Sequence, residues 1–289
     1  MSAISALALL SHKLPSSRWK VRAGRVLAAG LSGLGLDVVS PVRLRDGAIL
    51  ILDPRGRTEG GPFWNGTYDD DQVDFLCLCL STLGEHLLDI GANVGLISIR
   101  VARAGATVEA VEPVAENAAR IAASARLSGV ADRINIQQLA LGETGGTMTL
   151  TREVGLGAAT GNAVDSSIAG TLKGISVTVP QVRLDDLELA AVDVIKIDVE
   201  GNEVFTLRGG MKTIEQFRPV ILGEFNSELM PLHGHSFLDV AELLDPLDYR
   251  YFQFVSATEI TEQKPRIGLG NAIAAPTEKV RSLPATIVG

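Results

Sequence analysis

The chain contains 289 residues and carries a formal net charge of -8, with a pI near 5.1. This acidic balance argues against broad binding to nucleic acid, because such binding depends on Lys and Arg side chains that neutralise phosphates. A hydrophobic content of 46% and a charged content of 21% are typical of a globular protein, and no run approaches the roughly 18 uninterrupted apolar residues of a membrane span.

The first part of the chain, residues 1–66, is predicted to form an N-terminal helical and hairpin extension. Residues 1 to about 36 show a helical pattern that glycines end. Residues 42–52 are expected to form a hairpin, because Asp46-Gly47 lies between two apolar runs. The helical part also contains a local basic cluster, made up of Arg18, Lys20, Arg22 and Arg25.

The two cysteines, Cys77 and Cys79, lie in a predicted helix over about residues 70–82. Their spacing fits neither a Cys-x-x-Cys redox pair nor a zinc site, which predicts reduced thiols on a buried helix and a cytoplasmic location. The apolar run over residues 3–10 is short and lacks the basic residues that precede the core of a secretory signal. Export is therefore not expected.

From residue 86 onward, strands and helices alternate, which is typical of an α/β doubly wound, mostly parallel sheet. The predicted strands are residues 86–90, 107–112, 134–139, 192–198, 219–225, 249–255 and 271–275. The predicted helices are residues 96–104, 115–128, 202–209 and 237–244. Residues 67–289 are therefore expected to form one domain around a seven-stranded sheet.

Residues 146–183 interrupt this alternation. The segments 147–150 and 175–179 have the pattern of an added hairpin around a loop rich in glycine, serine and alanine. Loops of this length are usually functional or disordered. We interpret the inserted segment as a lid that faces a substrate.

A turn of small residues follows the first strand of the alternating part. Asp89 ends that strand, and the turn runs over residues 91–95. A dinucleotide-binding loop would read Gly-x-Gly-x-x-Gly, whereas this chain has Asn93 at the position of the middle glycine and an acid before the turn. The pattern favours a ligand with an ammonium group over a pyrophosphate.

A second acid ends the next strand. Glu112 lies about twenty residues after the turn, where α/β nucleotide-binding folds place a carboxylate on the ribose hydroxyls. Ligands of such sheets bind outside the carboxyl ends of the strands. Because Asp89, Glu112, Ala140 and Asp198 all fall near predicted strand ends, we interpret them as parts of one site.

These motifs, together with Ile195-Lys196-Ile197-Asp198-Val199-Glu200-Gly201, carry a family resemblance. From about Tyr68 to Phe225 the chain resembles the S-adenosylmethionine-dependent methyltransferases of the FkbM type. The resemblance implies a Rossmann-like class I methyltransferase domain and S-adenosylmethionine as the cofactor. The cofactor-binding residues that it implies are Tyr68, Asp89, Gly91, Ala92, Asn93, Gly95, Glu112, Pro113, Ala140 and Asp198.

Lys196, Asp198 and Glu200 alternate along a predicted strand, so they are expected to share one face. An unpaired buried charge is very costly, which means that the three either pair with one another or serve a ligand. The functional interpretation places Asp198 against cofactor and acceptor, with the other two holding the acceptor or its proton. Glu224 ends the next strand and is expected to face the same cleft.

His233 is the remaining catalytic candidate, because histidine titrates near neutrality and is the commonest general base. It lies in a loop together with His235, a pattern that is more often found on a surface. No cluster of His, Cys and carboxylates has the spacing of a zinc site, so no metal is expected. The run Asp69-Asp70-Asp71 is interpreted as a helix N-terminus.

By resemblance, the leading hypothesis is O-methylation of a hydroxyl on a small natural product or sugar, in secondary metabolism. N-methylation of an amide or peptide nitrogen stays open, as does a non-catalytic module that binds the cofactor. A nicotinamide-dependent oxidoreductase would need a glycine at position 93 and a catalytic Tyr/Lys pair, and neither is in place. The expected partner is a small-molecule acceptor, and association into a homo-oligomer stays open.

Overall fold

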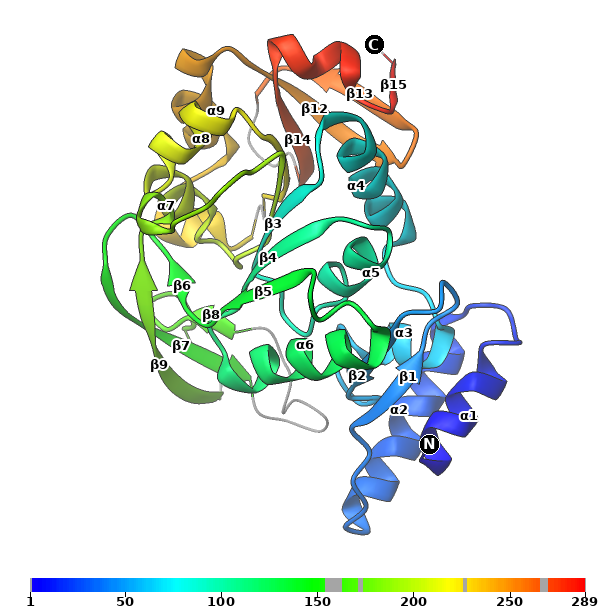
Figure 1. Cartoon of the computed structure of the whole chain (residues 1–289). Helices are drawn as coiled ribbons and strands as arrows, with labels where there is room; N and C mark the ends of the chain where they lie inside the picture. Colours follow the sequence, from blue (N-terminus) through cyan, green and yellow to red (C-terminus); the bar gives the residue numbers. More distant parts are fainter. Residues whose placement is uncertain (1, 154–162, 171–173, 226–227, 266–269, 289) are drawn as a thin grey trace.

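The computed structural model describes residues 2–153, 163–170, 174–225, 228–265 and 270–288 (Figure 1). In this part of the chain, nine strands form a mixed sheet in the order β15-β13-β12-β14-β11-β10-β3-β4-β5. Their bounds are β3 His86–Ile90, β4 Thr107–Val111, β5 Ile134–Gln137, β10 Val194–Ile197, β11 Val220–Glu224, β12 Tyr249–Ser256, β13 Glu259–Gln263, β14 Asn271–Pro276 and β15 Thr286–Val288. The strands from β5 to β11 run parallel, which confirms the predicted α/β, mostly parallel architecture.

The seven predicted strands form one contiguous part of this sheet, but the sheet is larger than predicted. β13 pairs antiparallel with β12, and β15 pairs with β13. The segment Glu259–Gln263 is largely polar and partly exposed, so it lacks the apolar pattern from which the other strands are predicted. The predicted strand 134–139 is also too long, because β5 ends at Gln137 and residues 140–141 form strand β6 of another sheet.

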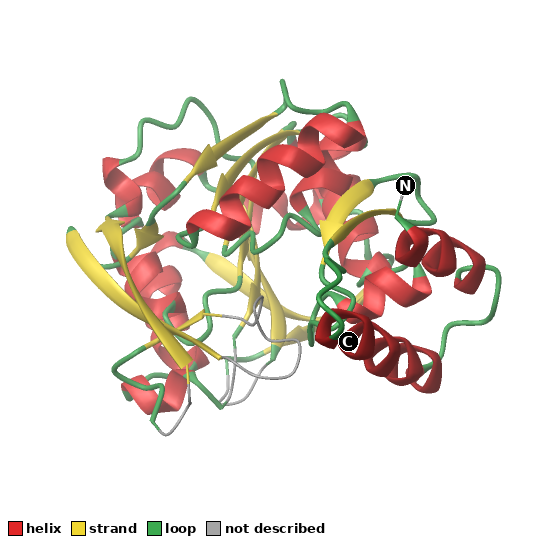
Figure 2. Cartoon of the chain, turned by 90° about the horizontal axis from the view of Figure 1, so that it is seen from below, coloured by secondary structure: helices red, strands yellow, loops and turns green. Residues whose placement is uncertain are grey.

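Helices cover both faces of the main sheet (Figure 2). One face buries side chains of α4 (Asp70–Leu83), α5 (Ser98–Arg103) and α6 (Ala115–Ser128) in a first hydrophobic cluster. The other face buries side chains of α7 (Glu203–Arg208), α8 (Met211–Phe217) and α9 (Phe237–Leu244) in a second cluster. The short 3-10 helices are η1 Leu184–Asp186, η2 Met230–His233, η3 Asp245–Leu247 and η4 Thr277–Ser282. Cys77 and Cys79 are free thiols on α4, as predicted.

Alternating residues of the central strands point to different clusters. Val194 belongs to the first cluster, whereas Ile195 and Ile197 belong to the second. Lys196 is the register partner of both Asp89 in β3 and Leu222 in β11. Because Leu222 belongs to the first cluster, the period of the strands places Lys196 and Asp89 on the same face as α4.

The N-terminal extension contains α1 (Ala3–Ser11), α2 (Arg18–Gly33), the hairpin β1 (Ser40–Arg43) and β2 (Ile49–Leu52), and α3 (Gly60–Asn65). The hairpin confirms its prediction. The helical pattern over residues 1–36, however, is divided into two helices, because Pro15 interrupts it and Ser17 begins α2 by accepting a hydrogen bond from Lys20 N at 3.2 Å. No helix of the described ranges is long and apolar enough to cross a membrane.

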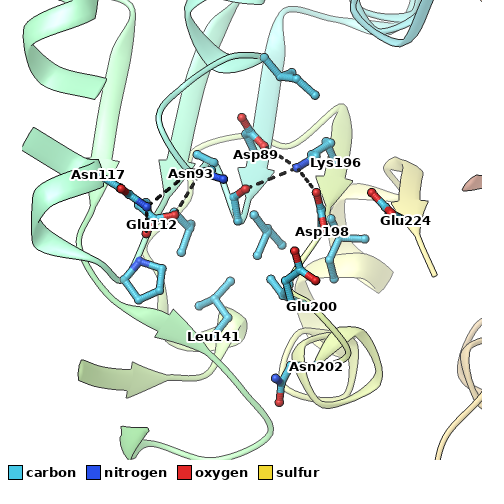
Figure 3. A pocket seen from close by; sticks show the side chains of 18 of the residues that line it. Asp89, Asn93, Glu112, Asn117, Leu141, Lys196, Asp198, Glu200, Asn202 and Glu224 are labelled. Carbon is cyan, nitrogen blue, oxygen red and sulfur yellow. Dashed lines mark hydrogen bonds and ion pairs between the residues drawn. The ribbon is translucent and has the colours of Figure 1, made fainter. Parts of the chain in front are cut away.

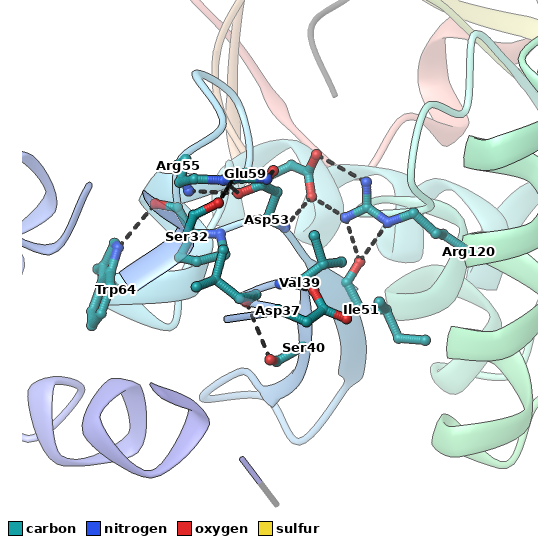
Figure 4. Close-up of polar contacts among 12 residues, drawn as sticks. Ser32, Asp37, Val39, Ser40, Ile51, Asp53, Arg55, Glu59, Trp64 and Arg120 are labelled. Atoms are coloured by element: carbon teal, nitrogen blue, oxygen red, sulfur yellow. Dashed lines mark hydrogen bonds and ion pairs between the residues drawn. The ribbon is translucent and has the colours of Figure 1, made fainter. Parts of the chain in front are cut away.

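The extension is fixed to α6 by polar contacts of its last strand and of the loop that follows (Figure 4). Ser124 and Ser128 accept hydrogen bonds from the backbone of β2, at 3.0 Å from Ile51 N and 2.9 Å from Ile49 N. Arg120 forms an ion pair with Glu59 and donates to Ile51 O at 2.7 Å. Residues on both sides of the predicted boundary at residue 66 also belong to the first hydrophobic cluster, so the extension and the rest of the chain share apolar packing.

The inserted segment forms a smaller sheet together with the preceding residues 140–141, in the order β6-β9-β7-β8 within the described part of the chain. Its strands are β6 Ala140–Leu141, β7 Gly146–Glu153, β8 Ala163–Asp165 and β9 Gly174–Val182. β7 and β9 pair antiparallel with Leu150 opposite Val177, so the predicted hairpin is confirmed. The centre of the predicted lid, residues 154–162 and 171–173, lies outside the described residues.

Candidate active site

A cavity of about 320 Å³ opens at the carboxyl ends of the parallel strands β3, β4, β10 and β11 (Figure 3). It lies where ligands bind in sheets of this kind. The structure brings most of the predicted site residues together in its lining, namely Tyr68, Asp89, Gly91, Ala92, Asn93, Glu112, Pro113, Ala140, Lys196, Asp198, Glu200 and Glu224. The side chains of Glu112 and Lys196 lie on opposite sides of this cavity in Figure 3.

Asp89 contributes an acceptor atom that receives no hydrogen bond from the described residues. Its carboxylate is buried, and Oδ2 accepts a hydrogen bond of 2.5 Å from Ser98 Oγ. Oδ1 has no hydrogen-bond partner among the described residues and lies 3.7 Å from Lys196 Nζ. A buried acceptor of this kind is costly unless a donor pairs with it, so this atom suits an ammonium or hydroxyl group of a ligand.

The turn after Asp89 needs glycine at its first position. Gly91 has a φ of +80°, and a Cβ there would lie 1.8 Å from Asp198 O. Gly91 thus lets the turns after β3 and β10 approach each other closely. Gly95 also has a positive φ, but it does not line the cavity, and a Cβ there would meet Ile99 and Ile121. Its predicted place in the cofactor site is corrected to a packing role in the turn.

Glu112 is held by groups on both sides of the turn that follows β4. Oε1 accepts from Val114 N at 2.9 Å and from Asn117 Nδ2 at 3.3 Å, and Oε2 accepts from Asn93 N at 2.9 Å. Burial raises the pKa of Glu112 to about 7, although these hydrogen bonds act in the opposite direction. The carboxylate therefore changes its charge near neutral pH.

Asn117 is a lining residue that the sequence interpretation missed. It lies near the start of α6 and is 4% exposed. Its side-chain amide donates to Asn93 Oδ1 at 3.3 Å and to Glu112 Oε1, so it connects the turn after β3 with the turn after β4. Its Oδ1 has no hydrogen-bond partner in the described ranges. The spacing of five residues from Glu112 on a helix that begins directly after the strand is the signal that could have revealed it.

Lys196 lies at the centre of a charged network on the other side of the cavity. Its Nζ is 3.5 Å from Asp198 Oδ2, 3.7 Å from Asp89 Oδ1 and 3.4 Å from Gly91 O. Burial acts to lower the pKa of Lys196, but the neighbouring carboxylates of Asp198 and Asp89 outweigh it and raise the pKa above its usual value. Lys196 is thus an ammonium ion at neutral pH and cannot serve as a base.

The predicted shared face of Lys196, Asp198 and Glu200 is only partly correct. β10 ends at Ile197, and Glu200 has a φ of +53°, so it lies in a turn and not on the strand. All three nevertheless line the cavity. The turn is held by Glu203, which was not among the predicted site residues and whose Oε1 accepts from Gly201 N at 3.1 Å and from Val199 N at 3.3 Å.

Two further carboxylates face the same side of the cavity, Glu224 from β11 and Asp69 at the start of α4. Burial, followed by the charge of Asp198, raises the pKa of Glu224. Burial also raises the pKa of Asp69. The sequence interpretation treated Asp69 only as part of a helix N-terminus. In the structure Asp69 precedes α4 with a φ of +43°, makes no side-chain capping hydrogen bond, and lines the cavity.

Tyr68 and Thr58 bring the extension and the following loop into the lining. Burial raises the pKa of Tyr68 to about 12, so its phenol keeps its proton at neutral pH. The lining residues that the sequence interpretation missed also include Gln72, Met148, Leu150 and Asn202. Thr58 precedes the stretch that carries the motifs, which gives no local signal for its position.

His233 does not line the cavity and is therefore not placed near its carboxylates. Its ring packs edge-on against Phe205, with 5.3 Å between the ring centroids. The ring of His235 packs against the same phenylalanine at 5.0 Å and lies 3.3 Å from Asp239 Oδ1. In this structure His233 belongs to the packing around α7 and α9, and its catalytic role stays a prediction that the cavity lining does not support.

A metal site does not emerge in the described ranges, where no group of three or more His, Cys, Asp or Glu side chains is arranged to hold an ion. Two of the cavity's carboxylates, Asp89 and Asp198, instead pair with the ammonium of Lys196. The expectation that the reaction needs no metal stays a prediction.

The family model of the methyltransferase FkbM domain matches residues 89–251, more than half of the chain. The chain is similar to the methyltransferase FkbM from Methylobacillus flagellatus KT, with 18% sequence identity and a TM-score of 0.44. The match covers 66% of this chain and 43% of that one, so this chain spans less than half of that protein's length. It is also similar to the O-methyltransferase from Bacillus cereus in complex with SAH, with 13% identity, a TM-score of 0.42, and coverage of 94% and 97%. No curated protein matches the chain. The chain belongs to the FkbM methyltransferase family, and its cofactor is S-adenosylmethionine.

Proposed function

We propose that the chain methylates a hydroxyl group of a small polar molecule, such as a natural product or a sugar. The observation that carries the cofactor part of this proposal is the buried Asp89 Oδ1, which accepts no hydrogen bond from the described residues, in the same cavity as Glu112. The hydroxyl acceptor is proposed from Glu224, a carboxylate with a raised pKa in the same lining. A methionine-type ammonium and a ribose diol both need acceptors, and these two acids supply them at separate positions. The residues present therefore fit S-adenosylmethionine.

The roles of the chain's own residues follow from their partners. Asp89 is proposed to accept from the ammonium group, with Lys196 Nζ 3.7 Å from the same carboxylate. Glu112 is proposed to accept from the ribose hydroxyls, and Asn117 holds it in place and offers its own Oδ1 as a further acceptor. When bound, the cofactor supplies a methyl group on a sulfonium, which is already an excellent leaving group. The protein's remaining tasks are alignment and removal of a proton.

The acceptor is proposed to bind between Asp198 and Glu224. In Figure 3, Glu224 lies on the side of Asp198 that faces away from Glu112, so this end of the cavity is separate from the proposed ribose position. Glu224 is proposed to be the general base, because its raised pKa brings it closer to the neutral range in which bases act best. Glu200 and Asp69 also line the cavity and are proposed to accept from further hydroxyl groups.

A methyl-transfer assay tests this function. S-adenosylmethionine with an isotopically labelled methyl group would be incubated with the full chain and with separate sets of hydroxyl-bearing and amide-bearing small molecules. We expect label on oxygen, located by mass spectrometry and NMR, and no transfer by the Asp198→Asn variant. Label on nitrogen alone would replace O-methylation by N-methylation, and cofactor binding without transfer to either set would favour a non-catalytic module. A place in secondary metabolism and a cytoplasmic location stay predictions.

A further inference from the structure

Helix α2 presents an apolar face to solvent. Trp19, Val26 and Leu27 are 78%, 70% and 45% exposed, and together with Ala23 and Gly30 they recur at the spacing of one helix face. A surface helix normally turns its apolar stripe towards the core and its polar side towards water. In α2 a second apolar stripe faces away from the protein.

The opposite face of α2 fixes this orientation. Gly24 and Ala28 are buried, and a Cβ at Gly24 would lie only 2.4 Å from ring atoms of Trp64. Trp64 is itself buried and donates to Pro54 O at 3.1 Å. Because α2 cannot rotate without breaking this close packing, the exposure of Trp19 is a property of the fold.

Exposed apolar side chains are concentrated in this part of the molecule. Eight of the sixteen exposed large apolar residues in the described ranges lie within the first 36 residues, an eighth of the chain. In addition to the three on α2 they are Leu7, Leu10, Leu14, Leu34 and Leu36. Large exposed apolar patches mark surfaces that bind a partner or a membrane.

The charge of the same segment is opposite to that of the rest of the chain. Residues 1–36 contain five Lys and Arg residues and neither Asp nor Glu, so the remaining residues carry a formal charge of -13. Arg18 and Arg22 are exposed and lie beside Trp19 on α2. They belong to the basic cluster of the sequence, whose Lys20 is buried and whose Arg25 donates to Gly56 O at 2.6 Å. None of the four lines the methyl-transfer cavity.

We propose that α1 and α2 dock on the surface of an anionic lipid bilayer, with the face of Trp19 and Val26 inserted at the interface. Basic amphipathic helices with Trp and Leu on the apolar side bind such surfaces through apolar burial and attraction to anionic lipids. Figure 1 shows α1 and α2 at the periphery of the molecule, on the side away from α7 and α9.

A second copy of the chain fits this face less well. A symmetric dimer places the same patch of both copies together, which would bring Arg18 and Arg22 of one copy near those of the other. Like charges at such a contact are unfavourable, whereas anionic headgroups neutralise them. The lipid surface is therefore the occupant that matches both the apolar face and its charge.

Vesicle flotation of the full chain tests the proposal. Vesicles of phosphatidylcholine mixed with an equal amount of phosphatidylglycerol should carry the chain to the top of a density gradient, and phosphatidylcholine vesicles should not. Two double variants should each lower the partition coefficient of the chain onto these vesicles by roughly tenfold or more. They are Trp19→Ser/Val26→Ser and Arg18→Gln/Arg22→Gln. Leu127→Ser/Val255→Ser, which removes two exposed apolar side chains elsewhere, should bind like the unchanged chain.

Tryptophan fluorescence gives a readout that does not depend on destabilising variants. Addition of the anionic vesicles should shift the emission of the unchanged chain to shorter wavelength, and brominated lipids should quench it. Trp19→Phe should abolish both effects, because the remaining Trp64 is buried. No flotation and no spectral change would overturn the proposal. Dimerisation in analytical ultracentrifugation that the Trp19→Ser/Val26→Ser variant abolishes, without vesicle binding, would assign the face to a second copy instead.

Discussion

Lys196 and Asp89 are register partners on the neighbouring parallel strands β10 and β3, and the distance between Lys196 Nζ and Asp89 Oδ1 is 3.7 Å. Both side chains are buried, so each charge depends on the other for compensation. The pair joins the two motifs that define the cavity, although they are more than a hundred residues apart in the sequence. It also fixes the Asp89 carboxylate at the position proposed for the cofactor's ammonium group.

Lys196→Met should therefore lower the free energy of unfolding by about 3–5 kcal/mol, because it leaves Asp89 buried without its cation. Adding Asp89→Asn should recover much of this loss, since no buried charge then remains. Urea denaturation at neutral pH measures both variants, with the exposed Lys212→Met as the matched control, expected to stay within about 0.5 kcal/mol of the unchanged chain. If Lys196→Met is as stable as the control, the ammonium is not needed to compensate Asp89.

Affinity for S-adenosylhomocysteine should increase with pH through the pKa of Glu112, which is about 7. Ribose hydroxyls donate hydrogen bonds to a carboxylate, so binding favours the ionised form that predominates above this pKa. Between roughly pH 6 and pH 8 the affinity should rise by about tenfold and then level off. Calorimetry at several pH values measures the change, and Glu112→Gln should bind weakly with little pH dependence. The same slope in this variant would assign the titration to another group.

Glu224→Gln should lower kcat by about a hundredfold or more and leave cofactor affinity within a few-fold, because it removes a base but keeps the size of the side chain. Glu200→Gln tests the alternative that Glu200 is the base in the same cavity. Glu215→Gln, on the exposed side of α8, is the matched control. Steady-state kinetics with the acceptor found in the methyl-transfer assay distinguishes the three. If Glu200→Gln alone loses turnover, the base lies in the turn after β10. Full kcat in both variants would make these carboxylates binding groups only.

The ion pair of Arg120 and Glu59 should be needed for stability, because Glu59 is completely buried and Arg120 donates to both of its oxygens. Arg120→Met should lower the free energy of unfolding by about 3–5 kcal/mol, and Glu59→Gln in the same chain should restore part of it. Arg126→Met, an exposed position on the same helix, is the control. An equal, small effect of both arginine substitutions would show that the extension is held mainly by its apolar contacts.

The sequence allowed prediction of those parts of the site that lie directly after strong local patterns. Asp89 and Glu112 each follow a run of apolar residues, and the position at the end of a parallel strand determines that both face the same edge of the sheet. The bounds of α6 and α9 agree with their predictions because their apolar periodicity is regular. In contrast, β13 is largely polar, and its position as a strand depends on its pairing with β12 and β15.

The errors concern residues whose position depends on contacts between distant parts of the chain. The run Asp69-Asp70-Asp71 lies at a helix N-terminus as predicted, but the additional place of Asp69 in the cavity lining, at a positive φ, is not revealed by a run of three acids. His233 is excluded from the cavity by its packing against Phe205. Thr58 reaches the lining through the attachment of the extension to α6, which rests on Glu59 and Arg120. None of these contacts has a signature in the local sequence.

Calorimetric titration of S-adenosylhomocysteine into the unchanged chain and into Glu112→Ala tests the central claim most directly. The proposed site predicts saturable binding at one site per chain, weakened by about 1.5–3 kcal/mol in the variant, which is roughly a ten- to hundredfold loss of affinity. Asn135→Ala, on β5 outside the cavity lining, should leave the affinity unchanged. Equal affinity of the unchanged chain and Glu112→Ala, or binding of a nicotinamide dinucleotide without binding of S-adenosylhomocysteine, would contradict the assignment of this cavity.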